Sequence, residues 1–266
     1  MTKILITGAT DEIGLETSLL LAREGCELIL HGRSAQKLAA AKEQVDGVSG
    51  NTASEICLAD FSSLDEVARM GREIALRHDR LDVLINNAGV FEAAETVTED
   101  GLDLRFVVNV FAPALLTREL LPLLGKTGRV INLSSAAQSP VDLALMRGER
   151  RAGDAMSTYA QSKLALTGWA MAMAETHPDG PSFVAVNPGS LLGSKMVKEG
   201  FGVAGNDLSI GAKILARASL AGEFAYPEGR YFDNDAGTWG APHPAVRDSV
   251  RRAEIVKLID NVIAAG

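Results

Sequence analysis

A tyrosine and a lysine four residues apart form the pair best suited to chemistry. Tyr159 and Lys163 lie in the run MSTYAQSKLALTGWAMAMAE, where apolar residues recur at helical spacing, so both side chains are expected on one face of a helix. An ammonium one turn from a phenol favours the phenolate and lowers a pKa that is about 10 when unperturbed. Such a tyrosine can exchange a proton with an alcohol or carbonyl oxygen near neutral pH. The same pair is more often a packed ring beside a solvated ammonium. The surrounding sequence is therefore needed to distinguish a catalytic pair from a structural one.

Predicted strands and helices alternate along the chain. Short apolar runs predict strands at Lys3–Thr7, Glu27–His31, Ala53–Leu58, Leu81–Asn86, Arg129–Leu133, Ser182–Asn187 and Arg230–Phe232. Helical spacing predicts helices at Ile13–Arg23, Ser34–Val45, Ser63–His78, Gly101–Leu124, around Tyr159, at Ser209–Ala221 and at Ala245–Ala264. We expect Ser63 and Glu66 to form a capping box and Pro113 to kink the longest helix. The alternation predicts an α/β fold with a doubly wound parallel sheet, in one domain over residues 1–266.

Two long segments interrupt this alternation. Ala136–Asp154 is polar and unusually long for a connection in an α/β domain, and Ser190–Asn206 is rich in glycine. We expect both to border the substrate entrance, and the second to be a lid over the cofactor. An ordinary surface loop is the alternative for the second segment.

Polar or glycine-rich residues follow the predicted strands. After the first strand, the turn Thr7–Gly14 delivers a helix N-terminus, whose backbone N–H groups and dipole suit a pyrophosphate. A tight turn without a ligand is the alternative. Asp11 and Glu12 place two carboxylates in this turn, which should weaken the binding of phosphates.

Arg33 follows the second strand in the turn His31-Gly32-Arg33-Ser34. In dinucleotide-binding folds a carboxylate near this place holds the ribose 2′-hydroxyl, whereas an arginine accommodates a 2′-phosphate. The sequence therefore favours NADP(H), with NAD(H) as the second choice. A solvated surface arginine is the alternative interpretation.

The later strands end in the same manner. Asp60 could accept a hydrogen bond from an adenine amino group after the third strand, and Asn86–Gly89 follow the fourth. Ser134 and Ser135 follow the fifth, and Asn187–Gly189 follow the sixth. Because ligands bind at the carboxyl ends of the strands in an open parallel sheet, these residues are expected to form one site.

The ordered set TGATDEIG, Asp60, NNAG, Asn109, the serine pair, YAQSK and NPG is similar to that of the short-chain dehydrogenase/reductase family, over nearly the whole chain. The resemblance implies a Rossmann-type sheet in three layers, α/β/α. It also implies that Ser135 orients a carbonyl, Tyr159 exchanges the proton, and Lys163 grips the nicotinamide ribose and lowers the tyrosine pKa. Asn109 would support a proton-relay water. Hydride would then move directly between the nicotinamide and the substrate carbon.

The same resemblance implies the residues that bind the cofactor. Besides Tyr159 and Lys163 they are Gly8, Thr10, Glu12, Ile13, Gly14, Arg33, Asp60, Phe61, Asn87, Ala88, Gly89, Pro188, Gly189 and Leu191. The long interval between Ser135 and Tyr159, the motif YFDNDAG at Tyr231–Gly237 and the late helix resemble the retinol-dehydrogenase and protochlorophyllide-reductase-like branch. The sequence departs from the family pattern at Gly193, where the family often has a threonine that binds the carboxamide of the nicotinamide. The nearest residue with a hydroxyl group is Ser194.

Composition excludes several other classes of protein. A net charge of −8 argues against a general affinity for nucleic acid or an anionic membrane. The N-terminus does not resemble a signal peptide and no long uncharged apolar stretch is present, so we expect a cytoplasmic protein that does not span a membrane. Cys26 and Cys57 are expected to be reduced core residues. The four histidines are scattered and predict no metal site.

Three functions fit these observations. The first is an NADP(H)-preferring oxidoreductase acting on a carbonyl or secondary alcohol of a small apolar substrate, with a homo-oligomer expected from the family alone. The second is a catalytically idle dinucleotide-binding regulator, which Glu12 favours. The third, a sugar-nucleotide epimerase, would need a larger C-terminal substrate region. A hydrolase is disfavoured because no G-x-S-x-G motif surrounds Ser135.

Overall fold

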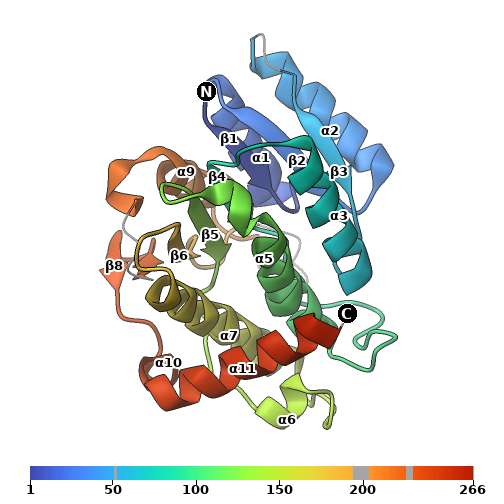
Figure 1. Cartoon of the computed structure of the whole chain (residues 1–266), viewed down its shortest axis with the longest axis vertical. Helices are drawn as coiled ribbons and strands as arrows, with labels where there is room; N and C mark the ends of the chain where they lie inside the picture. The colour runs from blue at the N-terminus through green and yellow to red at the C-terminus, as the bar shows by residue number, and fades with distance from the viewer. Residues whose placement is uncertain (51–52, 194–203, 226–229, 266) are drawn as a thin grey trace.

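The computed structural model describes residues 1–50, 53–193, 204–225 and 230–265, and at its centre lies one sheet of eight strands (Figure 1). The strands are β1 (Lys3–Ile6), β2 (Glu27–Gly32), β3 (Glu55–Leu58), β4 (Val83–Asn86), β5 (Arg129–Leu133), β6 (Ser182–Asn187), β7 (Arg230–Asp233) and β8 (Thr238–Gly240). Their order is β3-β2-β1-β4-β5-β6-β7-β8, and every neighbouring pair is parallel except β7 and β8. The predicted doubly wound sheet is confirmed. Strand β8 was not predicted, because its three residues form no apolar run.

Helices cover both faces of the sheet. They are α1 (Glu12–Arg23), α2 (Ala35–Val48), α3 (Leu64–Arg77), α4 (Leu104–Phe106), α5 (Ala112–Leu124), α6 (Leu143–Met146), α7 (Ala155–Thr176), α9 (Leu208–Leu220), α10 (Pro244–Arg247) and α11 (Ser249–Ala265), with a short 3₁₀ turn at Gly222–Phe224. Helices α1, α2 and α9 lie on one face, and α3, α5 and α7 lie on the other (Figure 1). Helix α11, red in Figure 1, packs against α7 and α5. These are the three layers that the sequence predicted.

Side chains alternate between two cores across the sheet. In β1, Ile4 and Ile6 belong to the core under α1 and α9, whereas Leu5 belongs to the core under α3, α5 and α7. Burial on both faces explains why the strands read as continuous apolar runs rather than as alternating patterns. The cores hold the sheet in place, so the residues that follow each strand are fixed at one edge.

The longest predicted helix differs from the expectation of Gly101–Leu124. It begins at Leu104, where the Asp103 side chain accepts a hydrogen bond from the Arg105 N–H at 2.9 Å. A wide π-helical turn, Val107–Phe111, then joins α4 to α5. Pro113 has no N–H to donate to the carbonyl of Asn109 four residues earlier, and a widened turn accommodates that loss. The irregularity expected at Pro113 is therefore a π-helical turn.

Two further helix boundaries correct the sequence analysis. Ser63 caps α3 by accepting from the Glu66 N–H, as expected, but the Glu66 carboxylate accepts from the Asp60 N–H at 2.8 Å and so does not complete a capping box. The C-terminal helix is divided into α10 and α11. Each half begins where a side chain, that of His243 or of Asp248, accepts hydrogen bonds from the next N–H groups.

The segment Leu104–Leu124 is long and apolar enough to cross a membrane by length and composition alone. However, 67% of its most apolar stretch is buried inside the fold, which is what a core helix of an α/β protein requires. Cys26 and Cys57 are both buried free thiols. Among the described residues, no group of three His, Cys, Asp or Glu side chains could hold a metal ion.

Candidate active site

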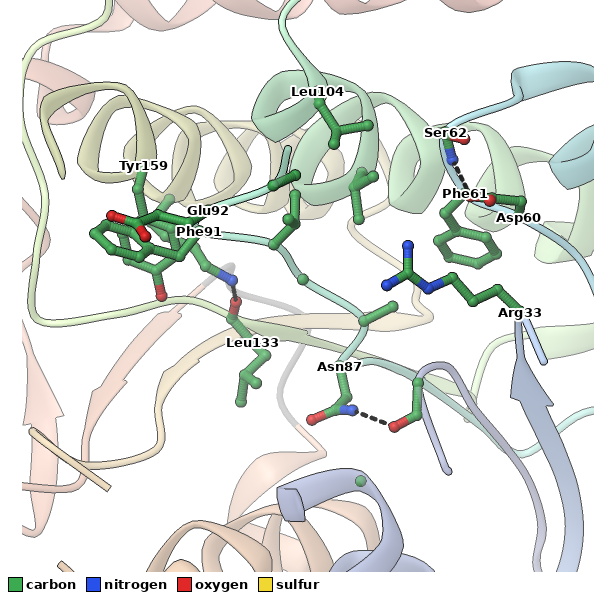
Figure 2. Close-up of a pocket in the computed structure, with 18 of the residues that line it drawn as sticks. Arg33, Asp60, Phe61, Ser62, Asn87, Phe91, Glu92, Leu104, Leu133 and Tyr159 are labelled. Carbon is green, nitrogen blue, oxygen red and sulfur yellow. Dashed lines mark hydrogen bonds between the residues drawn. The ribbon is translucent and has the colours of Figure 1, made fainter. Parts of the chain in front are cut away.

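A cavity of about 2140 Å³ opens at the carboxyl ends of strands β1 to β6. It is lined by every residue that the sequence assigned to cofactor binding or catalysis, except Asn109. In Figure 2, Arg33 and Tyr159 lie at opposite ends of the drawn pocket, with Asn87 between them. One cavity therefore joins the end expected to hold the 2′-phosphate to the end expected to do chemistry.

Tyr159 lies on the first turns of α7, and its hydroxyl is hydrogen-bonded to the side chain of Ser135. Burial raises the pKa of Tyr159 to about 12, while the hydrogen bond with Ser135 acts in the opposite direction. The ring of Phe91 packs edge-on against it, with the ring centroids 5.4 Å apart. The expectation of a lowered tyrosine pKa is therefore wrong for this structure, because removing the phenol from water outweighs the groups that favour the phenolate.

Lys163 lies one helical turn after Tyr159 and is 3% exposed. Its ammonium donates a hydrogen bond to the carbonyl oxygen of Leu133, the last residue of β5, at 2.7 Å (Figure 2). The Nζ atom lies 5.5 Å from the centroid of the Tyr159 ring. Burial lowers the pKa of Lys163 to about 8. The lysine and the tyrosine thus lie near each other as the helical spacing predicted, but the lysine donates its hydrogen bond to strand β5 and not to the tyrosine hydroxyl.

Asn109 lies in the π-helical turn and is 1% exposed. Its side chain accepts from the Val90 N–H at 2.8 Å and donates to the Val90 carbonyl at 3.0 Å. It also donates to the Ser162 hydroxyl at 2.9 Å. In this structure the side chain fastens the loop after β4 to helix α7, behind the wall of the cavity.

Close packing of the protein on itself requires glycine at two positions of the turn between β1 and α1. Gly8 has a φ of +65°, and a Cβ there would lie 3.0 Å from the Cα of Ala88. A Cβ on Gly14 would lie 2.1 Å from the carbonyl oxygen of Gly8. Asn87 fastens the turn by donating to the carbonyls of Thr7 and Gly8, at 2.8 and 3.1 Å. The turn lines the cavity at the N-terminus of α1, where backbone N–H groups and the helix dipole suit the pyrophosphate of a dinucleotide.

The two acidic residues of this turn differ in their surroundings. Asp11 forms an ion pair with Lys37, with Nζ 2.9 Å from Oδ2, and accepts from the Thr10 hydroxyl at 3.1 Å. Glu12 begins α1 with a φ of +51°, in the left-handed region that favours glycine. The side chain of Asp11 is therefore compensated by a cation, whereas the backbone of Glu12 is strained.

His31, which the sequence analysis did not assign to the site, holds the other side of the same turn. Its Nδ1 lies 3.2 Å from the Gly8 amide nitrogen, which donates to it, and its Nε2 lies 3.1 Å from the Ala59 carbonyl oxygen. The ring stacks on Phe61, with centroids 4.1 Å apart. Burial lowers the pKa of His31 to about 4, so the ring is neutral at neutral pH and can accept from Gly8. The sequence feature that could have identified it is a polar side chain at the end of a buried strand.

Arg33 and Asp60 lie at the far end of the cavity from Tyr159. Arg33 is exposed, forms no ion pair with any described residue, and extends its guanidinium past Phe61 towards the middle of the drawn pocket in Figure 2. Asp60 accepts from the Ser62 N–H at 2.9 Å. The arginine is therefore available to an anionic group at this end.

The sequence matches a known family. The family model described as short chain dehydrogenase covers residues 2–201. The chain belongs to this family. It is therefore an NAD(P)-dependent oxidoreductase that acts on a small molecule.

Relatives place the chain near the retinol-dehydrogenase branch, as its motifs predicted. Human retinol dehydrogenase 13 is 30% identical, over 96% of this chain and 84% of that protein. Mouse retinol dehydrogenase 13 is 34% identical, but the match covers 61% of this chain and 50% of the relative. Among solved structures, an uncharacterised protein from Mycobacterium paratuberculosis is 26% identical with a TM-score of 0.79, over 99% of this chain and 94% of the other. A proposed short chain dehydrogenase from Escherichia coli CFT073, complexed with NADPH, has the same fold at 24% identity and a TM-score of 0.72, over 88% and 96% of the two chains.

The two long segments of this short chain dehydrogenase contribute differently to the described cavity. From Ala136–Asp154, Ala136 and Ala137 line it; farther along, α6 packs on its neighbours, and Gln161 accepts from the Asp142 N–H at 2.9 Å. From Ser190–Asn206, residues 190–192 line it. Residues 194–203, including the hydroxyl expected at Ser194, lie outside the described residues, so the lid stays a prediction.

Proposed function

We propose that this short chain dehydrogenase prefers NADP(H) and interconverts a carbonyl and an alcohol through Ser135, Tyr159 and Lys163. The observation that carries the proposal is the Tyr159 hydroxyl, hydrogen-bonded to Ser135 at the wall of the cavity and within reach of the Lys163 charge. The dinucleotide, when bound, supplies the hydride donor or acceptor. The protein supplies the proton and the orientation.

A protonated Tyr159 can serve as the proton donor when a carbonyl is reduced. With a pKa of about 12, the phenol is protonated at neutral pH and can donate its proton to the oxygen of a substrate carbonyl. In this proposal the Ser135 hydroxyl hydrogen-bonds the same oxygen and stabilises the phenolate that remains. The Lys163 ammonium, 5.5 Å from the ring, adds a positive charge that favours this phenolate.

Three charged residues bear on the preference for NADP(H). Arg33 offers an exposed guanidinium that no described carboxylate neutralises, at the end of the cavity opposite Tyr159. A 2′-phosphate there would gain charge-assisted hydrogen bonds. Asp11 opposes this less than its charge suggests, because Lys37 pairs with it. The Glu12 carboxylate in the same turn adds a second negative charge that opposes it.

The apolar part of the cavity lining favours an apolar substrate. Its aliphatic and aromatic side chains include Phe91, Val97, Leu102, Leu104, Val108, Met156, Leu191, Leu192 and Val262. Such walls gain free energy by removing apolar surface from water. Together with the name of the human relative, they make lipophilic aldehydes and ketones the first substrates to test.

The test is a spectrophotometric scan. Purified protein is mixed with NADPH or NADH and a panel that includes retinal, long-chain aldehydes, aromatic ketones and a hydrophilic sugar ketone as control. The proposal predicts oxidation of NADPH with at least one lipophilic carbonyl, and slower turnover with NADH. Tight binding of NADPH without turnover on any member of the panel would instead support the regulator.

A further inference from the structure

The motif Tyr231–Gly237 has no role in the chemistry above, yet it touches the site at several points. It forms β7 and the turn that leads into β8, at the edge of the sheet next to β6. The Tyr231 hydroxyl donates to the carbonyl of Ser135 at 3.2 Å. Asn234 donates to the carbonyl of Pro188 at 2.9 Å. The hairpin therefore contacts both the proposed catalytic serine and the loop after β6.

That loop holds an unfavourable backbone conformation. Gly189 has a φ of +125°, and Leu191, which is not a glycine, has a φ of +51°. Residues in this region persist only when the surrounding structure holds them there. Ser190 lies between the two, so whatever binds Ser190 fixes the shape of the loop.

Asp235 binds both the N–H and the hydroxyl of Ser190, while the Asn206 side chain donates to the Ser190 carbonyl oxygen at 3.1 Å. The Oδ1 of Asp235 accepts from the Ser190 N–H at 2.8 Å, and its Oδ2 accepts from the Ser190 hydroxyl at 2.5 Å. The Asn187 side chain donates to Oδ2 of Asp235 at 2.9 Å and also to Asp233 at 2.9 Å. Although burial acts to raise it, the hydrogen bonds from Ser190 and Asn187 leave the pKa of Asp235 below its usual value, so the carboxylate is ionised at neutral pH.

The place of the loop identifies what it would position. Residues 188–192 line the same cavity as Ser135 and Tyr159, and β6 lies beside β5, whose end carries Ser135. Arg33 and Asp60 follow β2 and β3, at the other side of the sheet. The loop thus borders the end of the cofactor site where the nicotinamide must lie if Tyr159 is to act on the substrate.

We propose that Asp235 is a positioning residue, which holds Pro188–Leu191 in the shape that receives the nicotinamide end of the cofactor. This role rests on the proposed function. In this proposal the hairpin motif helps to bind the nicotinamide half of the dinucleotide. The residues around Arg33 bind the adenine half.

The test compares a whole cofactor with a fragment that lacks nicotinamide. Calorimetric titration gives dissociation constants for NADPH and 2′-phospho-ADP-ribose, and for NADH and ADP-ribose, with wild type and Asp235→Asn. We expect Asp235→Asn to weaken the binding of the whole cofactor about ten-fold, since a charge-assisted pair becomes a neutral one, and to change the fragment less than two-fold. Asp248→Asn is the matched control: Asp248 also accepts from two backbone N–H groups, of Val250 and Arg251, but lies outside the cavity lining.

A double-variant cycle makes the assignment specific. Ser190→Ala alone should weaken the whole cofactor, and adding it to Asp235→Asn should weaken binding by less than the sum of the two single effects. Equal weakening of cofactor and fragment, or an unchanged dissociation constant for the whole cofactor, would overturn the positioning role while leaving the proposed function intact. Wild type that binds none of the four ligands would instead refute the proposed function and, with it, this role.

Discussion

Lys163 donates its ammonium hydrogen bond to the carbonyl oxygen of Leu133, at 2.7 Å, at the point where β5 ends. This bond fixes the ammonium 5.5 Å from the Tyr159 ring, although burial lowers the pKa of Lys163 to about 8. The amine is therefore charged at pH 7 and increasingly neutral above pH 8. In the proposed function, both the contact of Lys163 with the ribose and its support of a phenolate would depend on that charge.

The binding of NADPH should accordingly weaken as the pH rises from 7 to 9. We expect the dissociation constant to increase by up to about ten-fold, because a charge-assisted hydrogen bond becomes a neutral one. Calorimetric titration at several pH values measures the change, with Lys163→Met as a variant whose affinity should be lower and nearly flat. A wild-type affinity that does not change over this range would contradict the role given to the charge of Lys163.

Arg33 should determine the choice between cofactors. Arg33→Ala is expected to weaken NADPH binding at least ten-fold and to change NADH binding less than two-fold, because NADH has no 2′-phosphate. Arg72→Ala is a suitable control, since Arg72 is also exposed and forms no ion pair with a described residue, but does not line the cavity. Equal affinity of the wild type for the two cofactors would refute the preference.

Glu12 should weaken cofactor binding through both its charge and its backbone. Two unit charges about 4 Å apart repel by roughly 1 kcal/mol in water and about 4 kcal/mol at a partly buried site. We therefore expect Glu12→Gly to tighten NADPH binding about ten-fold, with Glu12→Gln giving the part that is due to charge. Asp11→Asn should have a smaller effect, because Lys37 already pairs with Asp11. If Glu12→Gly leaves affinity unchanged or weaker, the glutamate is accommodated.

His31 should make the fold sensitive to acid. Its pKa is about 4 in the folded protein and near 6.5 when exposed, so the unfolded chain binds more protons between these values. Stability should rise as the pH increases from 4 to 6.5, by about 3 kcal/mol from this residue, and be unaffected by it above that range. Urea unfolding of wild type and His31→Gln at pH 4.5 and 7 measures the difference. The same pH dependence in both proteins would show that another group is responsible.

The sequence allowed the sheet and most of the cavity to be predicted, because buried parallel strands are continuous apolar runs and ligand-binding residues follow their carboxyl ends. The sequence was less informative about short elements and about contacts between residues far apart in the chain. Helix α6 has four residues and no period that could be recognised. The bond between Asn187 and Asp235 spans 48 positions, and no local pattern encodes it.

The pKa of Tyr159 is a second property that the sequence alone did not predict correctly. The spacing of Tyr159 and Lys163 reveals a neighbouring charge, but not the burial that outweighs it. Likewise, Pro113 predicted an irregularity in its helix, but not that this irregularity would be a π-helical turn that contains Asn109. Burial and backbone geometry depend on the whole fold, so they could be obtained only from the structure.

The most direct test of the account is the activity of Tyr159→Phe on a substrate found in the scan. The variant keeps the ring that packs on Phe91 and loses only the hydroxyl, so NADPH should bind with nearly wild-type affinity. Turnover should fall by at least about 100-fold, the lower end of what general acid catalysis contributes. A variant that retains more than about a tenth of wild-type turnover would contradict the assignment of Tyr159 as the proton donor.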